Sequence, residues 1–189
     1  LFGARDVWFV VALPVYLASS LGWDNGYVGS FLALWIIAYG VVQTQAPRFT
    51  GKREGRVPDG KVAMGWALVL ALTPALIALA LHFDLHPAIS LVGGLMVFGA
   101  LFAINSSLHS YLIVSYAGAD GVSLDVGFYY MANALGRLLG TLLSGLVFQL
   151  HGLEACLWLS TLFILLAALF SLGLPRHQPP VSSHSHGVS

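Results

Sequence analysis

The stretch that decides the fold is residues 122–149, which read VSLDVGFYYMANALGRLLGTLLSGLVFQ. A helix needs about 20 mostly apolar residues to cross a bilayer, and this stretch supplies them. Near its middle stands Arg137. A charge in hydrocarbon costs roughly 2.5 to 3.5 kcal/mol even on lenient scales, so Arg137 must face a cavity or a partner. The stretch therefore predicts a spanning helix with one polar side.

That polar side extends along the helix, because Tyr130, Asn133, Arg137, Thr141 and Ser144 recur every three or four residues and share one face. The functional interpretation is a binding surface on which the planar guanidinium of Arg137 holds an anion. In the alternative, Arg137 pairs with a carboxylate elsewhere and locks helices together. We favour the first, because the stripe carries more polar groups than one lock requires.

Two glycines lie beside this stripe. Gly136 and Gly140 are one turn apart, with Ser144 one turn further on. Small residues at this spacing allow another segment to approach the helix closely. We interpret the pair as a packing feature.

The rest of the chain continues the pattern. Hydrophobic residues make up 58% of the sequence and charged residues 8%, against about 25% charged in a soluble domain. Six apolar blocks are separated by short polar or Gly/Pro-containing breaks, at 1–21, 27–45, 62–81, 88–110, 122–149 and 153–174. Pro14 and Pro74 should kink the first and third blocks. The predicted fold is an all-α integral membrane protein with six transmembrane helices.

Basic residues predict the orientation, since cytoplasmic loops carry the positive excess. The Lys and Arg residues outside the spans lie on one side: Arg48, Lys52, Arg53, Arg56, Lys61 and Arg176. We therefore expect the protein in the inner (plasma) membrane, with the 46–61 loop and both chain ends in the cytoplasm. Asp24, Asp84 and Glu154 then belong to the outer side. Residues 175–189, rich in Pro, Ser and His, should form a disordered cytoplasmic tail.

Three further residues within the predicted spans are candidates for a function. Arg5 and Asp6 lie at the start of the first span. If they lie well inside the membrane, we expect them to contact substrate or to carry a coupled proton. If they lie near the membrane surface, they anchor the helix at the interface. His109 lies in a polar cluster that ends the fourth span. It could hydrogen-bond a ligand or relay a proton, or simply mark a helix end that meets water.

Several classes of function are disfavoured. The sequence has no phosphate-binding Gly-rich loop, no paired metal ligands at helical spacing and no nucleophile elbow, so we expect no enzyme, cofactor or metal. The formal charge is zero, which offers no basic field for nucleic acid.

Six spans with a basic central loop resemble one half of a major facilitator superfamily transporter. Residues 52–56, KREGR, are similar to the Asp-Arg-x-Gly-Arg loop signature of that family, with Lys52 in place of the Asp. The resemblance implies that residues 1–174 are helices seven to twelve of a twelve-helix bundle. The partner would be an amino-terminal half of the same transporter, in a longer protein than the sequence given.

Three stretches resemble organoarsenical efflux permeases of the ArsJ type: GARDVWFVVALP at 3–14, FLALW at 31–35 and MANALGR at 131–137. The implied function is export of an arsenylated phosphoglycerate by alternating access, which confers arsenic resistance. Besides Arg137, the expected substrate contacts are Asn133, Tyr130, Arg5 and His109, and Asp6 is the candidate for proton coupling. The alternatives are a major facilitator exporter of a sugar or drug, and a self-contained six-helix channel or scaffold.

Overall fold

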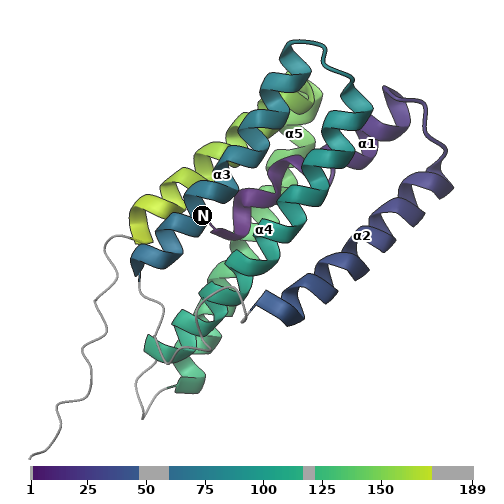
Figure 1. The fold of residues 1–189 in the computed structure, drawn as a ribbon. Coiled ribbons are helices and arrows are strands. Elements are labelled where there is room, and N and C mark those ends of the chain that lie inside the picture. Colours follow the sequence, from purple (N-terminus) through teal and green to yellow (C-terminus); the bar gives the residue numbers. More distant parts are fainter. Residues whose placement is uncertain (1, 47–59, 117–121, 172–189) are drawn as a thin grey trace, which may run out of the picture.

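The computed structural model describes residues 2–46, 60–116 and 122–171, which form helices joined by short turns. The elements follow in the order η1 (Phe2–Trp8), α1 (Ala12–Ser19), α2 (Asn25–Gln45), α3 (Gly60–His82), α4 (Pro87–Tyr116) and α5 (Val122–Ser171). Figure 1 shows α3, α4 and α5 side by side, with η1 among them and α2 at one edge.

The helices of the bundle are as long, and its outer surface is as apolar, as those of a membrane protein. Four helical segments are long and apolar enough to cross a bilayer: Asn25–Gln45, Lys61–His82, Pro87–Leu112 and Val126–Ser171. Large apolar side chains also point outward, such as Leu72 and Leu76 on α3 and Leu142 and Leu146 on α5. Lipid is the solvent that accepts such a surface. The predicted all-helical membrane fold is confirmed.

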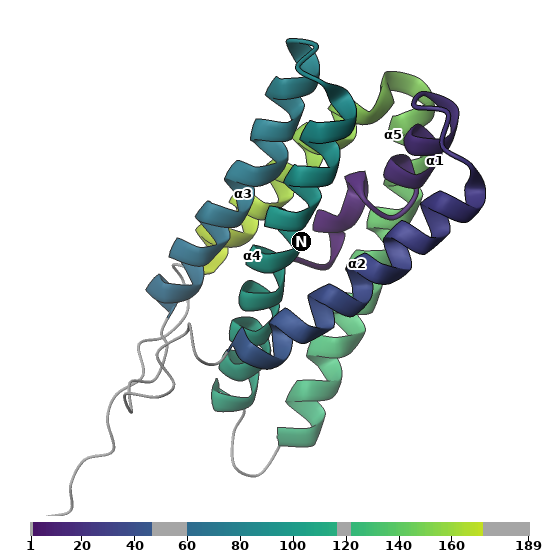
Figure 2. The same ribbon diagram turned by 45° about the vertical axis from the view of Figure 1, so that its right-hand side comes forward.

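The predicted count of six helices is wrong, since the described residues form five α-helices and one 3-10 helix. The fifth and sixth predicted spans belong to α5, which contains Gly152 at φ 77° and ψ −173°. This backbone conformation is open essentially to glycine alone. In Figure 2 the chain reverses near this point, so α5 consists of two arms, 122–151 and 153–171.

The first predicted span, 1–21, is also not one helix. It consists of η1, a turn at residues 9–11, and α1. Pro14 explains the break, because its ring would clash with the carbonyl of a preceding helical turn, and proline is tolerated only in the first turn. Helix α1 accordingly begins at Ala12, two residues before Pro14.

Segment η1 packs directly on α5 through glycines. A Cβ atom on Gly136 would lie 3.2 Å from the Cα of Gly3, and one on Gly140 would lie 3.0 Å from the carbonyl oxygen of Ala4. The prediction that this glycine pair permits a close approach is confirmed, and the approaching segment is η1. Ser160, on the second arm of α5, donates a hydrogen bond to the Arg5 carbonyl and fixes η1 from the other side.

Helix α2 is the least buried of the candidate spans, with Val28 and Trp35 as its buried residues. The indole Nε1 of Trp35 donates to the Leu95 carbonyl of α4 at 2.9 Å. A Cβ on Gly99 would lie 2.9 Å from the same ring, so this glycine makes room for the indole. Trp35 therefore attaches α2 to α4.

The predicted outer residues gather at one end of the bundle. The α1–α2 and α3–α4 connections and the reversal near Gly152 all lie at the upper end in Figure 2. Asp24 caps α2 there by accepting from the Gly26 N–H at 2.7 Å, and Glu154 Oε1 lies 3.3 Å from His82 Nδ1. Most of the basic 46–61 loop and the 175–189 tail lie outside the described residues.

Candidate functional site

A cavity of ≈ 290 Å³ opens between four parts of the fold: η1 with the turn after it, α2, α4 and the first arm of α5. Its lining combines ionisable, polar and aromatic side chains. The lining residues are Arg5, Asp6, Phe9, Trp35, Ile36, Tyr39, Phe98, Phe102, Ser106, Asn133 and Arg137.

Arg5 and Asp6 form the inner ionic part of this cavity. Their side chains lie within the bundle, and the residues are only 5% and 9% exposed. Arg5 Nε is 3.7 Å from Asp6 Oδ1, and the guanidinium carbon lies 4.0 Å from the centre of the Phe102 ring. Both residues are therefore buried inside the bundle, with the arginine held between a carboxylate and an aromatic face.

The polar stripe of α5 divides into two parts. Asn133 and Arg137 line the cavity, and Arg137 is exposed in the described structure. Thr141 instead donates its hydroxyl to the Arg137 carbonyl at 2.9 Å, and Ser144 is fully buried. The Asn133–Arg137 end of the stripe therefore presents polar side chains to the cavity. At the other end, the hydroxyl of Thr141 is hydrogen-bonded to the backbone.

Tyr130 and His109 lie apart from the cavity lining given by the described residues. Tyr130 is 59% exposed, and its ring contacts Tyr129 at a centroid distance of 5.5 Å. His109 Nδ1 lies 2.9 Å from the Asn105 carbonyl oxygen on the same helix. The polar side chain that α4 contributes to the described lining is Ser106. The structure thus brings together four of the six predicted site residues: Arg5, Asp6, Asn133 and Arg137.

The aromatic wall of the cavity was missed by the sequence analysis. Tyr39 stacks on Trp35 at 5.7 Å between ring centres and contacts Phe102 at 5.1 Å, and Phe98 stacks on Phe102 at 5.6 Å. A signal for it was available, because Trp35 with Tyr39 and Phe98 with Phe102 are spaced four residues apart on their helices. Such pairs are common in apolar spans and do not by themselves indicate a site.

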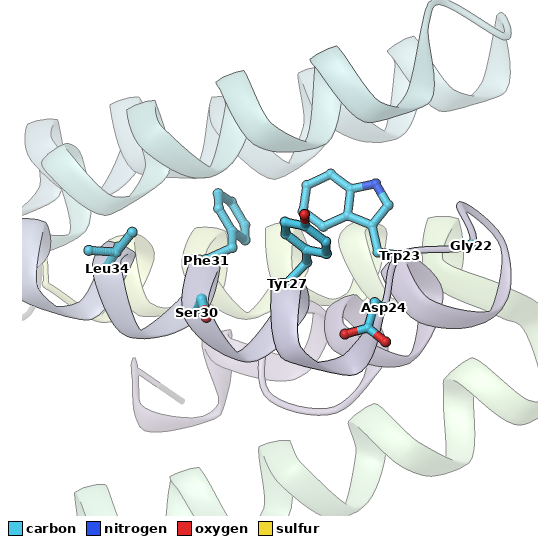
Figure 3. A pocket seen from close by; sticks show the side chains of 7 residues that line it. All are labelled: Gly22, Trp23, Asp24, Tyr27, Ser30, Phe31 and Leu34. Carbon is cyan, nitrogen blue, oxygen red and sulfur yellow. The ribbon is translucent and has the colours of Figure 1, made fainter.

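A larger pocket of ≈ 660 Å³ lies at the start of α2 (Figure 3). Trp23, Tyr27 and Phe31 point to the same side of the helix, and the Asp24 carboxylate points away from them. That carboxylate already caps the helix. Trp and Tyr at a helix end are typical of the membrane–water interface. We therefore place the candidate site in the smaller cavity, where two arginines and a carboxylate meet.

The fold and the site together define a multi-pass helical membrane protein with a charged, aromatic-walled cavity inside its bundle. The family model of the Major Facilitator Superfamily matches residues 1–188, and the chain belongs to this superfamily. It is a membrane transporter of the major facilitator kind, with the lipid bilayer around it and a small solute as substrate. Searches of curated proteins and of solved structures give no match.

Proposed function

We propose that this transporter carries a small organic anion, which binds in the cavity between η1, α2, α4 and α5. The observation that supports the proposal is the described lining, in which Arg5 and Arg137 stand against one carboxylate, that of Asp6. A cavity with surplus positive charge in a low-dielectric bundle favours an anion. Arg137 contributes the exposed guanidinium fork that suits a carboxylate or phosphate.

We propose further that residues 1–174 are one half of an alternating-access exporter, completed by an amino-terminal half. The two arms of α5 support this, because each is long enough to cross a bilayer at about 1.5 Å per residue. In this arrangement two helical halves rock about a midplane site. The basic residues of the 46–61 loop support a cytoplasmic position for that loop and for both ends, in the inner membrane.

The specific cargo that we propose is an arsenylated phosphoglycerate, with arsenic resistance as the result. The support is the resemblance to organoarsenical permeases, whose three matching stretches contribute cavity residues: Arg5 and Asp6, Trp35, and Asn133 with Arg137. Arsenate tolerance tests this cargo in cells with and without the complete gene and the partner enzyme that makes the cargo. Unchanged tolerance would remove the arsenical and leave the anion proposal standing.

Arg137→Ala tests the anion site itself. In everted vesicles that contain the complete transporter, we expect anion accumulation to fall to background while the protein remains in the membrane. Arg137→Lys should retain part of the activity, because it keeps the charge but loses the fork. Glu154→Gln, at the bundle end, is the matched charge control. Full accumulation by Arg137→Ala would refute the assignment.

We propose Asp6 as the proton-coupling residue, because its carboxylate lines the cavity and lies 3.7 Å from Arg5 Nε. Asp6→Asn should remove the dependence of transport on the proton gradient. A variant that still transports with unchanged gradient dependence would eliminate this role. Tyr130 and His109 stay as proposed substrate contacts, and each is tested by alanine substitution in the same vesicles.

A further inference from the structure

We propose that the cavity binds aromatic monoanions, meaning a planar ring attached directly to one oxyanion group such as a carboxylate. This inference rests on the proposed anion site and not on the arsenylated cargo. That cargo has no ring and carries more than one negative charge, so the two ligand classes are competing assignments for the same cavity. The inference follows from the charge of the lining, from the aromatic wall and from the size of the cavity.

The charge of the lining corresponds to one anion. The described lining carries two guanidinium groups, Arg5 and Arg137, and one carboxylate, Asp6, which leaves one positive charge in the state with Asp6 ionised. Arg5 also has Asp6 and the Phe102 ring as partners, whereas Arg137 is exposed. A ligand with one negative charge therefore neutralises the cavity, and a polyanion would add repulsion against Asp6.

The aromatic wall accounts for the ring. Five aromatic side chains line the cavity, and they come from three places: Phe9 after η1, Trp35 and Tyr39 on α2, and Phe98 and Phe102 on α4. Phe9 and Trp35 are 4.6 Å apart between ring centres, so the wall is continuous. Aromatic rings attract a further ring through offset-stacked or edge-to-face contacts, beyond the gain from burial.

Tyr39 has the central position in this wall. It contacts Trp35 on its own helix and Phe102 on α4, and it is half-buried, so part of its ring faces the cavity. The charged groups and the side-chain amide come from other elements, η1 and α5, and α4 adds the hydroxyl of Ser106. A ligand therefore meets aromatic side chains from α2 and α4, and charged or amide groups from η1 and α5. This arrangement orients a molecule that is apolar at one end and anionic at the other.

The volume fits one ring and one oxyanion. A buried site of about 150 Å³ accommodates benzene in other proteins. The cavity here has ≈ 290 Å³, which leaves room for an attached carboxylate and its hydrogen-bond partners.

Calorimetric titration of the purified complete transporter in lipid nanodiscs tests the proposal with four probes: benzoate, cyclohexanecarboxylate, acetate and 3-phosphoglycerate. Benzoate and cyclohexanecarboxylate have the same charge and similar size and differ in aromaticity. We expect benzoate to bind at least about fivefold more tightly than the other three, in line with the stacking contribution of an aromatic pair. Equal affinity for benzoate and cyclohexanecarboxylate would overturn the proposal without any need for a variant.

Variants of Tyr39 locate the ring. Tyr39→Leu should weaken benzoate binding about three- to tenfold, whereas Tyr39→Phe keeps the ring and the affinity. Tyr27→Leu is the matched control, because Tyr27 is on the same helix but lines the other pocket. Loss of benzoate affinity in Tyr27→Leu, or none in Tyr39→Leu, contradicts the inference.

Arg137→Ala separates this inference from the proposed function. If the variant abolishes binding of all anions while aromaticity has no effect, the anion site stands and the aromatic class fails. If it changes the binding of none of the probes, the anion site itself fails, and this inference fails with it.

Discussion

The Oγ atom of Ser144 accepts a hydrogen bond from the backbone N–H of Ala12 at 3.0 Å, although 132 positions separate the two residues. It also accepts from the Val11 N–H at 3.2 Å. The helix that begins here has no side-chain cap of its own. Ser144 of α5 therefore serves as the cap of α1 and holds the break between η1 and α1 in place.

Ser144→Ala should lower the free energy of unfolding by about 1–2 kcal/mol, because the buried N–H of Ala12 and the half-buried N–H of Val11 lose their acceptor. Unfolding of the purified protein in mixed detergent micelles measures the change. Thr141→Ala is the control on the same helix, since its hydroxyl donates to a carbonyl within its own helix. An equal loss in the two variants would show that Ser144 is not a cap.

Gly140→Ala should displace η1 and weaken anion binding together with stability. The added Cβ would lie 3.0 Å from the carbonyl oxygen and 3.1 Å from the Cα of Ala4, which are backbone atoms that cannot rotate away. Overpacking of this kind costs about 1–3 kcal/mol. The melting temperature and the affinity of the titration above should both fall. Gly145→Ala, where nothing lies within 4 Å, should leave both unchanged or raise the melting temperature.

The sequence could predict the membrane class and the positions of the helices, because long apolar blocks have one physical explanation. It could not predict where the helices inside these blocks begin and end. Pro14 indicated a kink, but the turn at 9–11 also depends on Ser144, which is distant in sequence. Gly152 indicated a break between two spans, and its left-handed conformation is a property of the folded chain.

For the site, the cost of a charge in lipid made Arg5, Asp6 and Arg137 candidates, and the structure places all three in one cavity. Periodicity put Ser144 in the same polar stripe, yet its hydroxyl is used for a backbone cap. Periodicity identifies which residues share a helix face. Whether the side chains of that face line a cavity or bind the backbone of another segment depends on the neighbouring elements. The aromatic wall was missed for the same reason, since three separate segments build it.

Gly152→Ala should strain the reversal between the two arms of α5. At φ 77° and ψ −173° a side chain costs about 1–3 kcal/mol, because this region is essentially restricted to glycine. We expect a lower melting temperature and a lower yield of folded protein from membranes. Gly127→Ala, in the first arm with nothing within 4 Å, is the control. If Gly152→Ala is as stable as that control, the reversal has another conformation in the membrane.

Trp35→Phe should loosen α2 from α4 without unfolding the bundle. The change removes the hydrogen bond to the Leu95 carbonyl at 2.9 Å but keeps a ring over Gly99. Since a hydrogen bond of this kind contributes about 1 kcal/mol, amide exchange in α2 should accelerate about fivefold, with α3 unchanged. Trp23→Phe is the matched control, because Trp23 makes a ring contact with Phe31 of α2 that a phenylalanine keeps in kind. Exchange that rises equally in α2 and α3 would mean that Trp35 supports the whole bundle. Exchange that rises in α2 alone would show that one wall of the cavity can move independently of the others, as a helix beside a transport site must when the cargo enters and leaves.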